Sequence, residues 1–145
     1  MKKYRGLSSI LLIDDDEATN FLTEFTIRRA GLDVQIEKVY NAQDGLDFLC
    51  CEGKFVHHLN KCDPQLIFLD LNMPGIDGWD FLNDYQQLKV KHHLNPVIII
   101  LTTSLNPDDM LKSKQFKDVK GFLNKPLSKE IILSIVGQYF NGEKA

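Results

Sequence analysis

A few polar side chains, each directly after an apolar run of the sequence, could together bind a cation and a phosphate group. They are Asp14 and Asp15, Asp70, Thr102 and Lys125. Carboxylates held close together repel one another unless a cation or a proton relieves the repulsion. Oxygen ligands suit Mg²⁺, which commonly takes one or two carboxylates and a phosphate. A lysine and a hydroxyl suit phosphate oxygens, so the chemistry expected of these groups is cation-assisted phosphoryl chemistry.

The apolar runs before these groups have the composition of buried strands, and segments of helical period alternate with them. We expect strands at residues 8–14, 34–40, 65–70, 96–101 and 120–124. Alternation of this kind predicts a parallel sheet with helices on both faces. The fold predicted is therefore a doubly wound α/β fold with a five-stranded parallel sheet and five helices. The carboxyl ends of its strands would meet at one edge and bring the polar groups together.

Each expected helix has an apolar stripe that should face the sheet. The inward residues predicted are Ala18, Phe21, Leu22 and Phe25; Ala42, Leu46 and Leu49; Phe81, Leu82, Tyr85 and Leu88; Met110, Leu111 and Phe116; and Ile131, Ile132, Ile135, Val136 and Tyr139. Asn41 and Asn106 are suited to cap the second and fourth helices. The fourth helix has few apolar residues, so we expect it to be loosely held.

Composition excludes several classes of protein. The 145 residues fit one domain, and no apolar run approaches the roughly 18 residues of a membrane span. A net charge of −3 argues against general nucleic-acid binding. Three cysteines without a framework spacing favour a reducing, cytoplasmic setting. The set Cys50, Cys51, His57, His58 and Cys62 matches no zinc template, so we favour surface positions over a metal site there.

Four motifs, in this order and spacing, resemble the receiver domain of two-component response regulators. They are Ile13-Asp14-Asp15, the segment Leu-Asp-Leu-Asn-Met-Pro-Gly-Ile-Asp-Gly at 69–78, Leu101-Thr102-Thr103, and Asn124-Lys125-Pro126. The resemblance covers residues 8–140, and leaves 1–7 as an N-terminal extension and 141–145 as a C-terminal tail. It implies a flavodoxin-like strand order of 2-1-3-4-5. With no room for an output domain, the chain is similar to the stand-alone, single-domain type.

The resemblance implies a role for each matching residue. Asp70 would accept a phosphoryl group from a histidine kinase or phosphotransfer protein. Asp14, Asp15, Asp70 and the backbone carbonyl of Asn72 would bind Mg²⁺. Thr102 and Lys125 would contact the phosphoryl group, and Phe122 would be the aromatic residue that changes rotamer. The lifetime of the phosphate would depend on Asn72 and Ser104.

The function expected is a phosphorylation switch, not an enzyme beyond its own phosphorylation and dephosphorylation. A downstream protein or a second copy would bind the surface of the fourth helix, fifth strand and fifth helix, with no nucleic-acid or membrane partner. One alternative is a receiver-like binding module that works without phosphorylation. Another is a small enzyme of the same fold. A phosphatase would need a second acid where Asn72 stands, and a flavin carrier would need a phosphate loop where the Asp14 and Asp15 carboxylates would repel phosphate.

Overall fold

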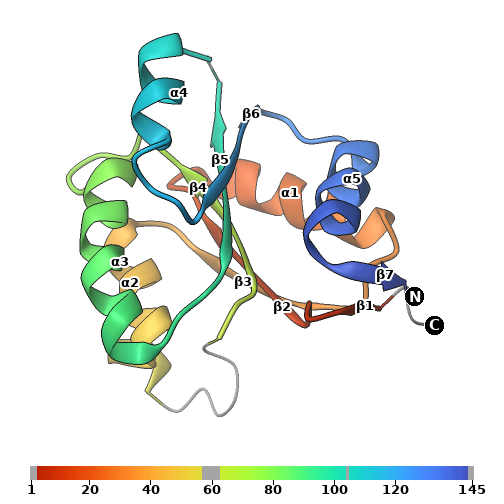
Figure 1. Cartoon of the computed structure of the whole chain (residues 1–145), viewed down its shortest axis with the longest axis horizontal. Helices are drawn as coiled ribbons and strands as arrows, with labels where there is room; N and C mark the ends of the chain where they lie inside the picture. Colours follow the sequence, from red (N-terminus) through yellow and green to blue (C-terminus); the bar gives the residue numbers. More distant parts are fainter. Residues whose placement is uncertain (1–2, 57–62, 104, 144–145) are drawn as a thin grey trace.

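The sheet has the predicted strands and order. The computed structural model describes residues 3–56, 63–103 and 105–143. Five parallel strands lie in the order β3-β2-β4-β5-β6, which in sequence order is the expected 2-1-3-4-5 (Figure 1). Their bounds are Ser9–Ile13 for β2, Gln35–Val39 for β3, Leu66–Asp70 for β4, Val97–Thr102 for β5 and Val119–Asn124 for β6.

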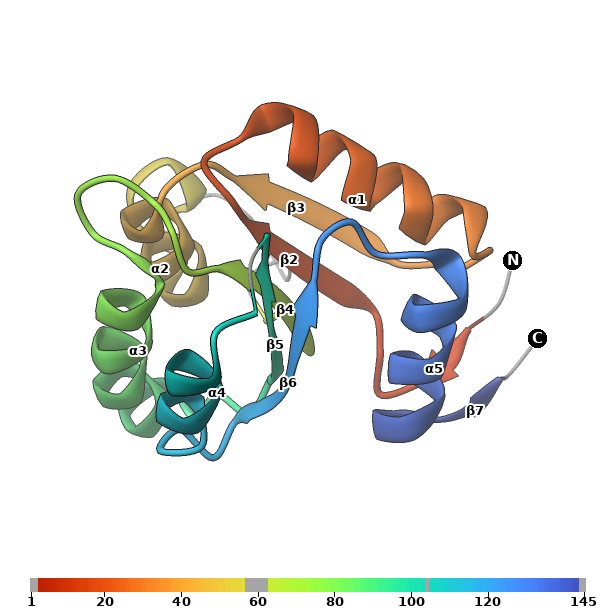
Figure 2. The same cartoon turned by 90° about the horizontal axis from the view of Figure 1, so that it is seen from above.

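Helices cover both faces of this sheet (Figure 2). One face carries α1 (Glu17–Arg29) and α5 (Lys129–Tyr139). The other carries α2 (Ala42–Cys50), α3 (Gly78–His92) and α4 (Pro107–Ser113), with a short 3₁₀ turn, η1 (Gly53–Phe55), after α2. Side chains of a strand alternate between the two faces, so Leu11 and Ile13 join one core and Ile10 and Leu12 the other. Two apolar cores therefore fix the sheet from both sides.

Polar caps begin the helices at the expected places. The Asp44 amide donates to the Asn41 side chain at 2.7 Å, and the Asp108 amide donates to that of Asn106 at 2.8 Å. Asp77 and Asp80 form a reciprocal capping box at the start of α3. Each cap satisfies backbone donors that the helix leaves unpaired, and so stabilises the residue at which the helix begins.

The predicted inward face of α1 is wrong. Phe21, Leu22 and Phe25 are 65%, 45% and 49% exposed, and Ala18 is exposed as well. The buried residues are instead Asn20, Thr23 and Ile27. Their spacing is also helical, and the Asn20 amide finds backbone acceptors inside the fold, so this polar face can be buried. The helix consequently presents an aromatic and aliphatic stripe to solvent.

Parts of the other apolar stripes also differ from expectation. On α4, Met110 is exposed and Leu111 is 67% exposed, whereas Phe116, just beyond the helix, is buried. Ser113 is the buried residue of this short helix. On α5, Ile132, Ile135 and Val136 face inward as predicted, but Ile131 is exposed. The predicted inward residues of α2 are all buried, and those of α3 pack inward, with Leu88 only partly buried.

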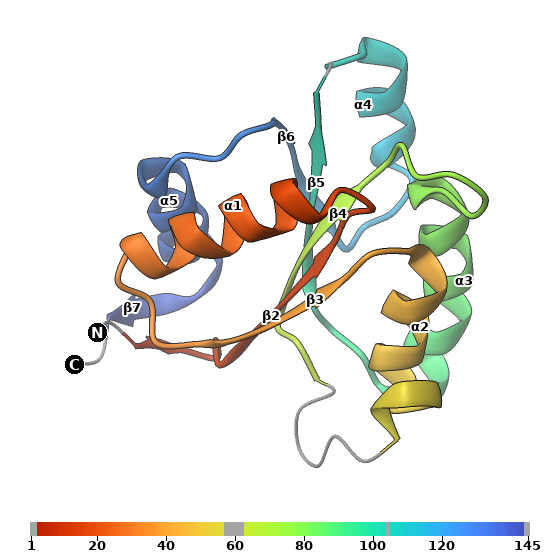
Figure 3. The same cartoon turned by 180° about the vertical axis from the view of Figure 1, so that it is seen from behind.

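A second, two-stranded sheet joins the two ends of the chain and was not expected from the sequence. Strand β1 (Tyr4–Arg5) pairs antiparallel with β7 (Asn141–Glu143), which follows α5 directly (Figure 3). Leu7 and Phe140, which flank this ribbon, are buried in the core under α1 and α5. The ends of the chain are thus tied to each other at the amino-terminal end of β2.

Two further expectations concern cysteines and membrane spans. Cys50 is a free thiol, but Cys51 is disulfide-bonded, which contradicts the expectation of reduced cysteines. His57, His58 and Cys62 lie outside the described residues. Within the described ranges, no helix combines the length and the apolar character that crossing a bilayer requires.

Candidate functional site

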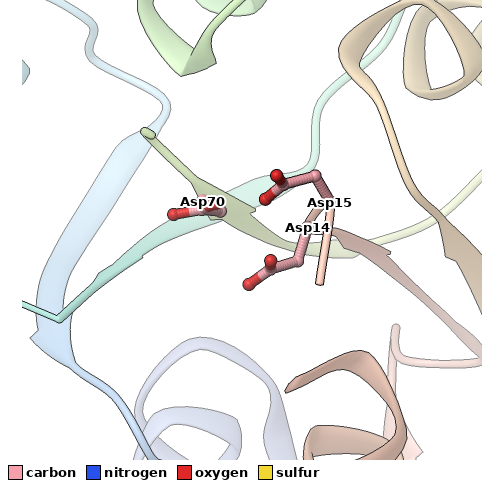
Figure 4. Close-up of side chains that lie close together, drawn as sticks. All are labelled: Asp14, Asp15 and Asp70. Carbon is pink, nitrogen blue, oxygen red and sulfur yellow. The ribbon is translucent and has the colours of Figure 1, made fainter. Parts of the chain in front are cut away.

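Three carboxylates gather at the carboxyl ends of β2 and β4 (Figure 4). Asp14 and Asp15 follow the last residue of β2, and Asp70 is the last residue of β4. Each offers an oxygen that lies within 4.8 Å of the others. Asp14 and Asp70 are buried, and Asp15 is exposed. Parallel pairing of β2 with β4 produces this juxtaposition, because it aligns the ends of the two strands.

Lys125 brings a positive charge to the same place from beyond β6. Its Nζ lies 2.6 Å from Asp14 Oδ2 and 3.3 Å from Asp70 Oδ1. The backbone amide of Lys125 donates to the carbonyl of Thr102 at 2.8 Å, which fixes the start of the loop after β6 against the end of β5. The lysine therefore bridges a buried pair of carboxylates.

Burial and mutual repulsion change the acid–base properties of this cluster. Burial, followed by the nearby Asp14 charge, raises the pKa of Asp70 despite the opposing effect of Lys125. For Lys125, burial favours the neutral form, but hydrogen bonding and attraction to Asp14 and Asp70 outweigh it and raise the pKa. The lysine accordingly remains charged. The charged form of Asp70 is disfavoured by its surroundings, and a bound cation would reduce that penalty.

Backbone amides and a helix cap hold the acidic loops in place. The Asp16 amide donates to Asp14 Oδ1 at 2.9 Å, and the Asn72 amide donates to Asp70 Oδ1 at 3.3 Å. The Asp16 side chain caps α1 by accepting from the Ala18 amide and the Thr19 hydroxyl. The Asp14 and Asp70 carboxylates are thus oriented before any ligand arrives.

The remaining predicted residues lie around this cluster. Thr102 ends β5, is buried, and pairs in register with Asn124 of β6. Phe122 is partly buried against the core between the sheet and α2–α3. Asn72 is exposed, and Ser104 lies outside the described residues. The structure therefore brings Asp14, Asp15, Asp70 and Lys125 together. Phe122 lies within β6, where it pairs with Ile100 of β5.

The carboxylates fit a hard divalent cation. They offer oxygen atoms alone, two of the three are buried, and Mg²⁺ commonly uses few protein carboxylates. In the part of the chain that is described, this is the one group of three such ligands close enough to hold an ion. The start of α3 also packs closely against the end of β4, because a Cβ at Gly78 would lie 2.8 Å from the carbonyl oxygen of Asp70.

A groove, mainly apolar where it begins at Lys125, runs along α1. A cavity of about 260 Å³ is lined by Leu22 and Thr26 of α1 and by Thr103, Lys125 and Leu127, and a second of about 320 Å³ continues past Phe25 to the start of α5. Lys125 lines the groove and also contacts Asp70. Sequence reasoning missed this surface because it assigned Leu22 and Phe25 to the core.

Comparison with known proteins agrees with this geometry. The chain matches the family model of the response regulator receiver domain over residues 10–137. It is 30% identical over 122 residues to "Probable methanogenesis regulatory protein FilR2" of Methanothrix harundinacea, covering 83% of this chain and 74% of that protein.

Solved structures show the same likeness. A two-component response regulator from Cytophaga hutchinsonii superposes with a TM-score of 0.79 at 27% identity, over 92% of this chain and 97% of that one. The Mn²⁺-bound form of response regulator Rcp1 gives a TM-score of 0.73 at 26% identity, over 92% and 95%. The chain therefore belongs to the response regulator receiver domain family.

Proposed function

We propose that this receiver domain accepts a phosphoryl group on Asp70 from a phosphohistidine of a histidine kinase or phosphotransfer protein, in the presence of Mg²⁺. The observation that carries the proposal is the placement of the buried Asp70 carboxylate between Asp14, Asp15 and Lys125. Phosphoryl transfer depends on positioning and charge neutralisation more than on covalent help from the protein, and these neighbours supply both.

The transfer itself is a single displacement at phosphorus. A carboxylate oxygen of Asp70 forms a bond to phosphorus as the bond from phosphorus to the donor imidazole nitrogen breaks, and the imidazole leaves with that electron pair. Lys125 remains beside Asp70 and neutralises charge on the acyl phosphate. Asp14, Asp15 and Asp70 are the carboxylates that would hold Mg²⁺, which when bound supplies positive charge to the phosphoryl oxygens. The Mn²⁺-bound form of Rcp1 supports a divalent cation in this fold.

The groove along α1 is the surface on which we propose that the donor protein docks. The stripe formed by Phe21, Leu22 and Phe25 is exposed, and the groove beside it starts at Lys125, which contacts Asp70. A contiguous apolar surface of this kind is typical of an interaction site. A helix carrying the donor histidine could pack on this stripe and reach the acceptor carboxylate.

The output surface proposed is formed by α4, β6 and α5. The α4 helix begins five residues after Thr102, buries few side chains and rests on α3 through a stack of Trp79 on Phe116, with Lys112 over the Trp79 ring. A shift of Thr102 toward a phosphoryl group, with Phe122 filling the vacated space, would therefore move a weakly packed helix. A downstream protein or a second copy would recognise the new surface.

Trp79 gives a direct test, because it is the single tryptophan of the chain and contacts Lys112 of α4 and Phe116 just beyond that helix. We expect beryllofluoride with Mg²⁺, a mimic of the phosphoryl group, to change Trp79 fluorescence saturably. Asp70→Asn should abolish the change, and Asp84→Asn, which alters an exposed carboxylate of α3, should retain it.

Mass spectrometry after incubation with phosphoramidate and Mg²⁺ provides a second, independent readout. We expect one phosphoryl group on the wild type and none on Asp70→Asn. If the wild type neither responds to beryllofluoride nor becomes phosphorylated, the alternative of a phosphorylation-independent binding module replaces this proposal.

A further inference from the structure

Asn20 is a buried polar residue of α1 whose side chain ties together the ends of two strands. It is 2% exposed, and its Nδ2 donates to the carbonyl oxygen of Asp14 at 3.1 Å and to that of Val39 at 3.0 Å. The Asp14 amide in turn donates to the Val39 carbonyl at 3.2 Å. Asn20 therefore closes the pairing of β2 with β3 at the point where the chain turns into the acidic loop.

The carbonyl that Asn20 holds belongs to the peptide bond between Asp14 and Asp15. The two carboxylates differ in what else orients them. Asp14 is held by Lys125 and by the Asp16 amide. Asp15 is exposed, and within the described part of the chain its carboxylate has no hydrogen bond or ion pair. The direction in which the Asp15 side chain leaves the chain, along its Cα–Cβ bond, consequently depends on its backbone, which begins with the peptide whose carbonyl Asn20 holds.

We propose that Asn20 is a positioning residue for the divalent cation: it fixes the Asp14–Asp15 peptide and so directs the Asp15 carboxylate toward Asp14 and Asp70. This inference rests on the proposed function of the site. Groups that orient metal ligands without contacting the metal typically contribute 10–100-fold to affinity, so we expect loss of the Asn20 amide to weaken Mg²⁺ binding by about tenfold.

Asparagine suits this position because its amide nitrogen carries two hydrogens, one for each carbonyl. A leucine of similar size would remove the Asn20 donor from the Asp14 carbonyl and leave the Val39 carbonyl with the Asp14 amide alone. An aspartate would place a further negative charge beside Asp14 and would confuse the measurement. Asn20→Leu is therefore the informative variant, and Asn20→Ala is a second variant that removes the amide without the bulk.

The experiment is a Mg²⁺ titration of the full chain by calorimetry, with thermal unfolding in EDTA measured in parallel. The matched control is Ile27→Ala, which destabilises the same buried face of α1 two turns away without contacting the acidic loop. We expect all three variants to melt at lower temperature than the wild type in EDTA. Only the Asn20 variants should bind Mg²⁺ about tenfold more weakly.

The outcomes separate this inference from the function on which it rests. If the wild type binds Mg²⁺ and beryllofluoride and folded Asn20→Leu and Asn20→Ala bind Mg²⁺ as tightly, Asn20 is only a structural residue and the inference is overturned. The inference is also overturned if Ile27→Ala loses as much affinity, because the effect would then be general destabilisation. If the wild type binds neither ligand, the proposed function fails, and the inference fails with it.

Discussion

Lys125 and Asp14, separated by 111 positions in the sequence, form an ion pair of 2.6 Å at the centre of the site. The pair joins the residue expected to contact a phosphoryl group to a residue expected to bind the cation. Because the lysine also lies 3.3 Å from Asp70, it is the nearest counter-charge for both buried carboxylates until a cation arrives.

Replacing this lysine should destabilise the protein most when no cation is present. Lys125→Met leaves two buried carboxylates facing each other, and breaking a buried ion pair typically costs about 3–5 kcal/mol. We expect a loss near the lower end of that range in urea unfolding with EDTA, and partial recovery with saturating Mg²⁺. Lys120→Met, at an exposed position of β6, should change little in either buffer. Equal losses in the free energy of unfolding for both variants would show that the ion pair of Lys125 and Asp14 does not stabilise the fold.

Asp70→Asn should raise stability in EDTA, and more so as the pH rises. Burial and Asp14 raise the pKa of Asp70, so the unfolded carboxyl loses its proton at lower pH than the folded one. Protonated Asp70 therefore contributes stability to the wild type below the pKa that Asp70 has in the unfolded chain. This contribution is lost as the pH rises through the pKa that Asp70 has in the folded protein. The amide that replaces this carboxyl does not titrate, so we expect the melting temperature of the variant to exceed that of the wild type increasingly from pH 4 to pH 7, by about 4 °C per kcal/mol gained. A lower melting temperature of the variant at pH 7 would contradict the proposed repulsion.

A buried hydrogen bond outside the site should contribute strongly to stability. The Tyr85 hydroxyl donates to Asp118 Oδ2 at 2.6 Å, and Lys89 lies 2.8 Å from the same oxygen. Tyr85→Phe removes the donor, and hydrogen bonds to charged groups contribute about 1.5–3 kcal/mol. Tyr139→Phe, which loses a bond to the Lys120 carbonyl at the surface, should cost less. Urea unfolding of both variants gives the comparison, and equal costs would contradict the prediction.

Two glycines should respond to alanine in opposite ways. At Gly78 a Cβ would lie 2.8 Å from the Asp70 carbonyl oxygen and from Leu71 Cα, so Gly78→Ala should destabilise by about 1–3 kcal/mol and weaken the response to beryllofluoride. At Gly137, in α5, a Cβ would meet nothing within 4 Å. Gly137→Ala should therefore stabilise by about 0.5–1 kcal/mol through helix propensity. Thermal unfolding checks both signs.

The α1 stripe should matter for a protein donor and not for a small one. Leu22→Asp is expected to slow phosphoryl transfer from a phosphorylated histidine-containing domain at least tenfold, while phosphorylation by phosphoramidate keeps its rate. Val90→Asp alters another exposed apolar residue, near the end of α3, and should leave both rates unchanged. A Leu22→Asp variant that receives the group from the protein donor at the wild-type rate would exclude docking on this helix.

The strands and the acidic site were predictable because apolar runs and the polar residues that end them are local features of the sequence, whereas the strand order was implied by the resemblance of the four motifs. The buried face of α1 could not be predicted in this way. Phe21, Leu22 and Phe25 repeat with helical period, but so do Asn20, Thr23 and Ile27. Which stripe is buried depends on the Asp14 and Val39 carbonyls, which only the assembled sheet presents to the Asn20 amide.

Other contacts escaped prediction for the same reason. The bond between Tyr85 and Asp118 joins residues 33 positions apart, and nothing near either residue indicates the other. The pairing of β1 with β7 joins the two ends of the chain through short segments with no strand pattern of their own. Met110 and Leu111 are exposed on a helix of seven residues, about two turns, in which Ser113 is the buried residue.

The terminal ribbon also has a practical consequence for handling the molecule. Because β1 precedes the amino end of β2 and β7 follows the last helix, both ends emerge at the pole opposite the carboxyl ends of the strands, as Figure 1 shows. A dye, a surface tether or a fused fluorescent protein at either end would therefore leave the acceptor pole open to its donor. A pair of fluorescent labels, one at each end, would report on separation of β1 from β7 beside α5.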